Sequence, residues 1–164
     1  MKITPYTQST LPAWDTMRNA LFHDEDPTLL QEESRQILTQ GTLKSQPFQC
    51  LLAFDDNDPA QPTPIGFIEL TIRSSAEECM TSPVLYIEGW YVDPEHQGKG
   101  VGKALMNAAF DWGREHNCKE AASDARPDNQ QSISAHHALG FEDAGVIHCF
   151  RTTIDEAAPE PHPR

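Results

Sequence analysis

Three glycines at alternate positions follow an apolar segment in the middle of the chain. The apolar segment runs from Val84 to Val92, and the glycines occupy alternate positions of residues 98–102, where a stretch with helical spacing begins. Glycine leaves backbone N–H groups uncovered, and the start of a helix adds unpaired donors and the positive end of its dipole. This order of strand, glycine turn and helix predicts a pyrophosphate site, which Lys99 and Lys103 would reinforce.

Two better-known phosphate loops do not fit this segment. A Walker loop needs Gly-Lys followed by Ser or Thr, but Gly98-Lys99 is followed by Gly100. A dinucleotide fingerprint needs its third glycine where Lys103 stands, although Glu120 lies at about the ~20-residue separation of a ribose-binding acid. The dinucleotide site is therefore the weaker alternative. A solvated glycine turn without a ligand is the other.

A carboxylate within the apolar segment is the leading candidate for acid–base chemistry. Glu88 is surrounded in sequence by apolar residues, and burying a charge is costly unless it has a partner or a task. The adjacent Gly89 predicts a bulge or a close approach of another backbone. Asp124, at the end of a later predicted strand, is a second candidate. The alternatives are that Glu88 lies on a solvated strand face and that Asp124 only stabilises a turn.

Hydrophobic periodicity and turn residues predict the elements that would position these groups. Leu11, Trp14, Met17 and Leu21 recur at helical spacing, and Asp26-Pro27 is typical of a helix start. We expect helices at residues 11–21, from 27 to Gly41, at 101–117 and at 129–139, and strands at 46–54, 65–73, 84–92, 118–124 and, as a final pair, within 141–153.

The order of these elements indicates the fold class. Strands and helices alternate only in the middle of the chain, which favours a mixed central β-sheet flanked by helices in one α/β (α+β) domain. At 164 residues the chain is most simply a single domain, residues 1–154. Residues 155–164 carry three prolines with little to bury, so we expect a disordered Pro-rich tail there.

Composition limits the partners and the compartment. The formal net charge of −13 disfavours nucleic acid or an anionic membrane and favours a cationic partner, although acidity alone also confers solubility. We find no secretory signal pattern and no run that approaches the ~20 apolar residues of a membrane span, so we expect a cytoplasmic protein. The four cysteines form no C-x-x-C pair, which argues for reduced thiols and against a zinc site.

The string from Gly89 to Gly102 resembles the acetyl-CoA signature of the GNAT superfamily of N-acetyltransferases, whose loop reads Arg/Gln-x-x-Gly-x-Gly/Ala. The preceding strand and a downstream Asn…Leu-Gly-Phe helix agree in order and spacing. The resemblance implies the GNAT fold, acetyl-CoA as co-substrate and no metal. It implies a cofactor site formed by Trp90, Tyr91, Val92, Gln97, Gly98, Lys99, Gly100, Val101, Gly102, Lys103 and Asn129. Asn129 is alternatively only a helix N-cap.

The same resemblance indicates which residues carry the chemistry. An amine must lose a proton to attack a thioester, and Glu88 is the candidate base, directly or through one water. The superfamily commonly places a tyrosine that protonates the leaving thiolate at the position of His136. Histidine supplies a proton near neutral pH, although a thiolate with an unperturbed pKa of ~8.5 can leave without assistance.

From Met1 to about Thr153 the chain resembles one group of bacterial aminoglycoside 6′-N-acetyltransferases. The strings that carry the resemblance include Leu11-Pro12-Ala13-Trp14, Ser82-Pro83-Val84, Cys118-Lys119-Glu120-Ala121-Ala122-Ser123-Asp124 and His136-His137-Ala138-Leu139-Gly140-Phe141-Glu142. In that group the residues matching Glu88 and Asp124 contact the aminoglycoside, and the loop matching Phe22 to Glu25 closes over it. The resemblance thus implies acetylation of the 6′-amine, and it leaves a homodimer possible.

Departures from that group leave alternatives open. Relatives place a histidine at Glu25, and a tyrosine and a glutamate at the positions of Ser75 and Gly145, so substrate preference is less determined than the reaction. A GNAT enzyme for polyamines, peptide N-termini or lysine would share the loop and the acid. A non-catalytic acetyl-CoA sensor and an acidic immunity or antitoxin-like protein that binds a basic partner are the other hypotheses.

Overall fold

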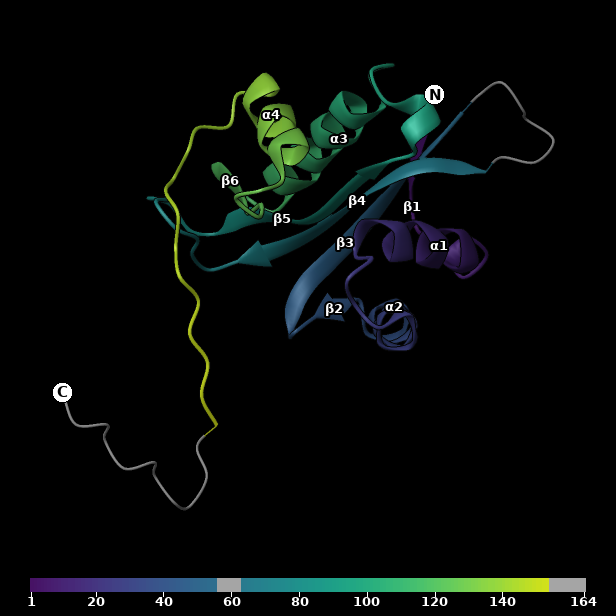
Figure 1. Cartoon of the computed structure of the whole chain (residues 1–164), viewed down its shortest axis with the longest axis horizontal. Coiled ribbons are helices and arrows are strands. Elements are labelled where there is room, and N and C mark those ends of the chain that lie inside the picture. Colours follow the sequence, from purple (N-terminus) through teal and green to yellow (C-terminus); the bar gives the residue numbers. More distant parts are fainter. Residues whose placement is uncertain (56–62, 154–164) are drawn as a thin grey trace.

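The computed structural model describes residues 1–55 and 63–153, and the predicted tail at 155–164 lies outside them. A mixed sheet forms the centre, with α1 and α2 on one side and α3 and α4 on the other (Figure 1). Its strands are β1 (Lys2–Pro5), β3 (Gln46–Phe54), β4 (Pro64–Arg73), β5 (Val84–Val92) and β6 (Glu120–Ser123), in that order, with the short β2 (Thr42–Leu43) paired to β3. All pairs are antiparallel except β5 with β6.

The helices lie within two residues of their predicted bounds. They are α1 (Leu11–Leu21), α2 (Pro27–Gln40), α3 (Val101–Glu115) and α4 (Gln130–Ala138), with a 3₁₀ turn at Pro94–His96. Asp26 caps α2 by accepting the Thr28 N–H at 2.8 Å, and Gly41 ends it in the left-handed conformation at φ 67°. The helix α3 ends two residues earlier than expected.

Two apolar layers sandwich the sheet because alternate side chains of each strand face opposite sides. Towards α3, buried Leu70 and Ile87 pack with Leu105 and Met106 of the helix. The larger members of the layer towards α1 and α2 are Trp14, Ile37, Phe48, Leu52 and Phe67. The strands β4 and β5 therefore lie at the centre of the domain, buried on both faces.

The prediction of two final strands within residues 141–153 is wrong. After α4, the described residues 141–153 form no strand and extend away from the rest of the domain (Figure 1). Val146, Ile147 and Phe150 have exposed fractions of 78%, 64% and 94%. The β-propensity of these residues suggested strands. A strand also requires a neighbouring backbone to pair with, and this segment does not lie beside the sheet.

No helix in the described part of the chain is both long enough and apolar enough to span a bilayer.

Candidate functional site

A bulge in the central strand pair places Glu88. In the register between β4 and β5, Glu69 lies opposite Gly89 and Leu70 lies opposite Ile87, so Glu88 is the extra residue of β5. A bulge interrupts the alternation of side chains, and both Glu88 and Gly89 consequently face the side that carries α1. The bulge expected beside Gly89 is confirmed.

Gly89 allows the end of α1 to approach the strand. A Cβ added to Gly89 would lie 3.1 Å from Cζ of Phe22, 3.2 Å from Cδ2 of Leu21 and 3.4 Å from Oε2 of Glu69. Phe22 is the C-cap of α1 and begins the loop to α2. The fold therefore brings two of the predicted acceptor-binding residues, Phe22 and Glu88, to neighbouring positions.

The Glu88 carboxylate has protein partners rather than a solvated environment. The Nη2 atom of Arg73 lies 2.8 Å from its Oε1 and 2.9 Å from its Oε2, and the Thr71 hydroxyl donates to Oε1. The exposed fraction of the Glu88 side chain is 18%. Because Thr71 and Arg73 are two residues apart in β4, they share the face onto which Glu88 points.

Asp124 belongs to the same polar group. It follows β6 and accepts a hydrogen bond from the Tyr86 hydroxyl at 2.8 Å. Burial, together with the hydrogen bond to the Asp124 carboxylate, raises the pKa of Tyr86, so the phenol stays protonated and donates. The guanidinium carbon of Arg73 lies 3.2 Å from the centroid of the Tyr86 ring. Arg73 and Tyr86 thus connect Glu88 to Asp124.

The loop after α1 reaches the segment that follows Asp124. The Glu25 N–H donates to the Phe22 carbonyl at 2.9 Å, which turns the loop, and the Glu25 side chain is exposed. Asp24 of this loop forms an ion pair with Arg126 at 3.0 Å. The predicted acceptor-binding residues therefore surround one region, although Glu25 lies at its solvent-facing edge.

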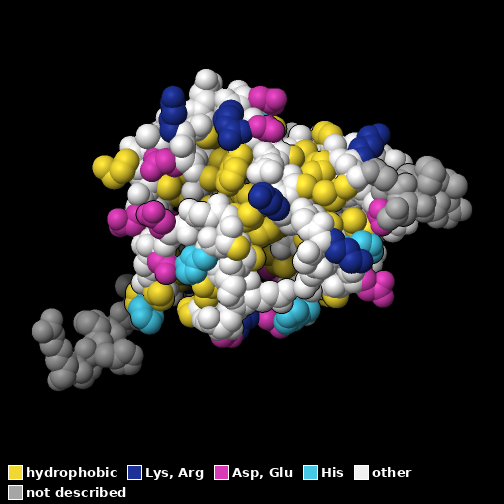
Figure 2. Space-filling view, turned by 90° about the horizontal axis from the view of Figure 1, so that it is seen from above, with side chains coloured by type: hydrophobic (Ala, Val, Ile, Leu, Met, Phe, Trp, Pro, Cys, Tyr) yellow, Lys and Arg dark blue, Asp and Glu magenta, His cyan; other side chains and the backbone are white. Residues whose placement is uncertain are grey.

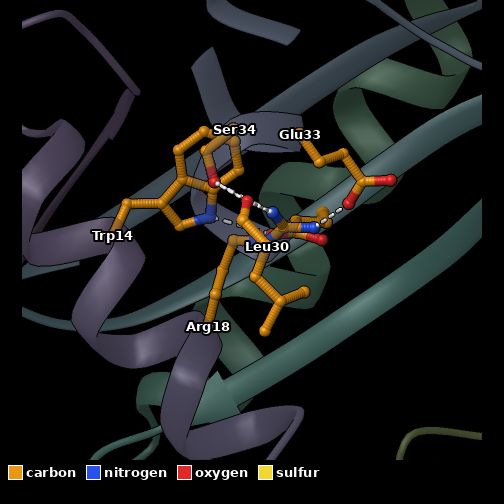
Figure 3. Close-up of polar contacts among 6 residues, drawn as sticks. Trp14, Arg18, Leu30, Glu33 and Ser34 are labelled. Atoms are coloured by element: carbon orange, nitrogen blue, oxygen red, sulfur yellow. Dashed lines mark hydrogen bonds and ion pairs between the residues drawn. The ribbon is translucent and has the colours of Figure 1, made fainter. Parts of the chain in front are cut away.

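A buried polar network anchors α1 just before this loop (Figure 3). Trp14 Nε1 donates to Glu69 Oε1 at 2.8 Å, and Arg18 Nε lies 2.8 Å from the same oxygen as an ion pair without a directed hydrogen bond. Arg18 also donates to Ser34 at 2.9 Å and to Glu33 at 2.6 Å, both in α2. Burial raises the pKa of Glu69 to about 7, an effect that Arg18 and Trp14 oppose.

The glycine loop adopts a geometry suited to an anion. Gly98 and Gly100 have φ of 71° and 84°, in the left-handed region that favours glycine. Gly100 is the N-cap of α3, and no described side chain caps the helix, so its first N–H groups face outward. Lys99 and Lys103 are exposed beside them. Figure 2, which looks onto the α3 and α4 side, shows Lys and Arg side chains around a hollow lined by hydrophobic groups.

Gly102 has a different requirement from the other two glycines. A Cβ at this position would lie 2.8 Å from Cζ2 of Trp90, which no real packing tolerates. The first turn of α3 thus rests directly on the Trp90 indole. Close packing against Trp90 therefore explains this glycine, in addition to its place in the glycine loop.

The end of β5 is free of β6. The strand β6 pairs only with Val84–Ile87, whereas Trp90, Tyr91 and Val92 pair with β4 and have no described strand on their other side. Half of the backbone groups of an antiparallel edge point outward. The strands thus separate beyond Ile87, and the outward groups of residues 90–92 are available to an extended ligand. The side chains of Trp90 and Tyr91 pack, the latter stacking on Phe67 at a centroid distance of 5.9 Å.

His136 lies against Trp90, with the ring centroids 5.4 Å apart and the planes almost perpendicular. Its Nδ1 lies 2.8 Å from the carbonyl of Ser132, and a carbonyl only accepts, so Nδ1 carries a proton. Among the described residues, neither His136 Nε2 nor Trp90 Nε1 has a hydrogen-bond partner, and both atoms are buried. His136 can therefore donate from Nε2 only when the ring is doubly protonated.

Two amide side chains connect the glycine loop with α4. Gln97 donates to the carbonyl of Val92 at 3.1 Å and accepts from Gln131 at 3.0 Å. Asn129 caps α4 by accepting the Ser132 N–H at 3.0 Å. Asn129 is thus confirmed as the N-cap of α4, and its additional contact with the cofactor stays a prediction.

Thr71, Arg73 and Tyr86 were not singled out from the sequence. The available signal was the pair of polar residues at alternate positions at the end of a predicted strand. Their contact with Glu88 depends on the register and the bulge, which the sequence does not reveal.

Comparisons with known proteins identify similar chains. Residues 12–141 match the family model described as Acetyltransferase (GNAT) family. A protein from Klebsiella aerogenes named Aminoglycoside N(6')-acetyltransferase type 1 is 37% identical over 152 residues, which cover 93% of this chain and 96% of that protein. A protein of the same name from Acinetobacter baumannii is 35% identical and covers 94% of this chain and 99% of its own length.

Solved structures with the same architecture cover nearly the whole chain. The aminoglycoside antibiotic 6'-N-acetyltransferase AAC(6')-IG from Acinetobacter haemolyticus, in its apo form, superposes with a TM-score of 0.82 at 32% identity, over 94% of this chain and all of that one. AAC(6')-Iy in complex with the bisubstrate analogue CoA-S-monomethyl-acetylneamine gives a TM-score of 0.80 at 28% identity, over 93% of this chain and 98% of that one.

Proposed function

Because the chain belongs to the acetyltransferase (GNAT) family, we propose that it transfers the acetyl group of acetyl-CoA to the 6′-amine of aminoglycoside antibiotics and thereby confers resistance. The observation that carries this proposal is the group of two linked carboxylates, Glu88 and Asp124, beside the loop that begins at Phe22. Relatives named for this activity, similar over more than nine-tenths of the chain, support it.

The residues of the glycine loop fit acetyl-CoA. The uncapped N–H groups at the start of α3, with Lys99 and Lys103 nearby, would bind its pyrophosphate. The outward backbone groups of Trp90, Tyr91 and Val92 would pair with pantetheine as an added strand does. Gln97, Gly98, Gly100, Val101, Gly102 and Asn129 complete the proposed site. Bound acetyl-CoA supplies an acetyl group activated as a thioester.

Glu88 is proposed to accept the proton that the amine loses, directly or through one water. Asp124, Phe22 and Glu25 would contact the rest of the aminoglycoside. His136, doubly protonated, would donate to the leaving thiolate from Nε2, which has no partner among the described residues and would have to be uncovered when acetyl-CoA binds. Glu88 acts at the amine and His136 at the thiol, so the two roles do not compete.

Charge supports a cationic small molecule as the partner rather than nucleic acid or a membrane. Aminoglycosides carry several ammonium groups, and the chain has a formal net charge of −13. Acetylation of one amine removes a positive charge and a donor, which weakens binding to ribosomal RNA. The four free cysteines are compatible with the reducing cytoplasm, where we propose that the enzyme acts.

We propose that the protein forms a homodimer through its C-terminal segment. Ile147 and Phe150 are exposed there, and β6 ends the sheet with no described neighbour on its outer side. A hollow beside β6 is lined by the apolar Leu85, Phe110 and Ala121 together with the charged Arg114, Lys119 and Glu120. A segment of a second copy would cover these groups and pair with the free edge. Sedimentation should give a dimer, and Phe150→Ser with Ile147→Ser should shift it towards monomer.

A thiol-release assay with a panel of amines tests the function. We expect release from acetyl-CoA to depend on an aminoglycoside with a 6′-amine. A faster reaction with a polyamine, a peptide N-terminus or lysine would assign another acceptor. Binding of acetyl-CoA without thiol release from any amine would favour a sensor, and co-purification with a basic protein would favour a binding role.

A further inference from the structure

The two carboxylate oxygens of Glu88 are used unequally. Oε1 accepts from the Thr71 hydroxyl and is contacted by Arg73 through Nε at 3.2 Å and Nη2 at 2.8 Å. Oε2 is contacted only by Nη2 of Arg73, at 2.9 Å, among the hydrogen bonds of the described residues. Each carboxylate oxygen has about two lone pairs, so Oε2 retains capacity for a further donor.

The edge of the Arg73 guanidinium contacts Glu88, and its flat face packs on Tyr86. Its guanidinium carbon lies 3.2 Å from the centroid of the Tyr86 ring, and the Tyr86 hydroxyl is fixed by Asp124 at 2.8 Å. Stacking and a forked ion pair together restrain the planar guanidinium in position and orientation. The side chain of Arg73 is 29% exposed, so solvent can reach the group, but its contacts define one geometry.

Strand register explains why these residues meet. Thr71 lies opposite Tyr86 in the pairing of β4 with β5, two residues from the bulge at Glu88. Thr71 is completely buried, so its hydroxyl has a fixed position and must be satisfied by a partner. Glu88 supplies that partner. The rigid centre of the sheet thus determines where the Glu88 carboxylate lies.

We propose that Thr71 and Arg73 are positioning residues for the acetyl transfer, which hold the Glu88 carboxylate so that Oε2 accepts the hydrogen bond of the acceptor amine. This inference rests on the proposed function, because it takes Glu88 as the group that meets the amine. Arg73 stays in place when the amine binds.

Paired variants test the positioning role. Arg73→Met removes the charge and the fork, and Arg73→Lys retains the charge alone. Thr71→Val removes the hydroxyl, and Thr71→Ser retains it. We expect Arg73→Met to lower kcat/KM for the amine by roughly 10- to 100-fold, with partial recovery in Arg73→Lys. Thr71→Val should be slower than Thr71→Ser. Calorimetry should give an unchanged Kd for acetyl-CoA, and thermal unfolding verifies that each variant is folded.

A double-mutant cycle with Glu88→Gln shows whether Arg73 acts through Glu88. If it does, the double variant should be no slower than Glu88→Gln alone, because the carboxylate that Arg73 positions is already absent. Additive losses would overturn the inference. Tighter calorimetric binding of the amine to Arg73→Met would also overturn it, because Arg73 would then compete with the amine for Glu88.

The cycle distinguishes this inference from the proposed function. It uses whichever amine releases thiol fastest, so it does not require an aminoglycoside. Wild-type activity in Glu88→Gln would remove Glu88 from the proposed function and this inference with it. If Glu88→Gln lowers kcat/KM for the amine but Arg73→Met does not, the positioning role of Arg73 is contradicted and the proposed function stands.

Discussion

Gly102 and Trp90 are in direct contact at the junction of helix and sheet. A Cβ on Gly102 would lie 2.8 Å from Cζ2 and 3.3 Å from Cε2 of the indole. The contact sets the distance between α3, whose N-terminus carries the proposed pyrophosphate site, and β5, whose free edge carries the proposed pantetheine site. The contact between Gly102 and Trp90 therefore fixes the positions of the two halves of the proposed cofactor site relative to each other.

Gly102→Ala should accordingly destabilise the fold. The ring cannot move without disturbing the layer beneath α3, so we expect a loss of about 1–3 kcal/mol in the free energy of unfolding. Urea denaturation measures it. The same substitution in a Trp90→Phe background should cost less, because the smaller ring leaves room for the methyl group. An equal cost in both backgrounds would show that the indole contact is not the cause.

Gly100→Ala should weaken acetyl-CoA binding, and Gly41→Ala is its matched control. Both glycines have positive φ, 84° and 67°, and both have open space where a Cβ would lie. The backbone strain of alanine is thus similar at the two positions, about 1 kcal/mol. Only Gly100 borders the uncapped start of α3. Calorimetry should show a weaker Kd for Gly100→Ala alone, and equal effects of the two would argue against a phosphate site there.

Asp124→Asn should raise KM for the acceptor more than the Kd of acetyl-CoA, because only the acceptor is positively charged. The change keeps the shape of the side chain and an acceptor for the Tyr86 hydroxyl, and it removes the negative charge. Tyr86→Phe is the control, since it removes the hydrogen bond but leaves the carboxylate ionised. If Asp124 only stabilises a turn, both variants should lower the melting temperature and leave KM unchanged.

Buried Glu69 should make the free energy of unfolding depend on pH. Burial raises its pKa to about 7 from an ordinary value of 4.5, so the folded state holds a proton that the unfolded state has lost between these values. The contribution is fully present below about pH 4.5 and is lost as pH rises through about 7. Relative to Glu69→Gln, the wild type should therefore lose on the order of 3 kcal/mol across this range. The opposite trend would show that the Arg18 ion pair outweighs burial.

The regular elements were predictable where local pattern and packing agree. The strands Gln46–Phe54 and Val84–Val92 match their predicted bounds, because both are long apolar runs between turn residues. The strand Lys2–Pro5 was missed, since four residues ending in proline give no readable period. The final strands were wrong because pairing, which the sequence does not encode locally, decides whether a strand forms.

The candidate site was predictable residue by residue but not as an arrangement. Glu88 was identifiable as a charge in an apolar strand, and Gly98 and Gly100 as glycines with a conformational task. Arg73 and Tyr86 were not, because their importance arises from facing Glu88 across a bulge. An extra residue in one strand reverses which side chains share a face, and no periodic pattern locates it in advance.

One paired measurement tests the central claim most directly. A kanamycin-type aminoglycoside with a 6′-amine and its analogue with a 6′-hydroxyl differ only in the group that the reaction consumes. We expect rapid thiol release and a 6′-N-acetyl product with the amine. The hydroxyl compound should give no N-acetyl product and should bind more weakly by at least ~2 kcal/mol, because the cation that pairs with a half-buried carboxylate is missing. Equal turnover of the two compounds, or spermidine reacting faster than every aminoglycoside, would contradict the assignment.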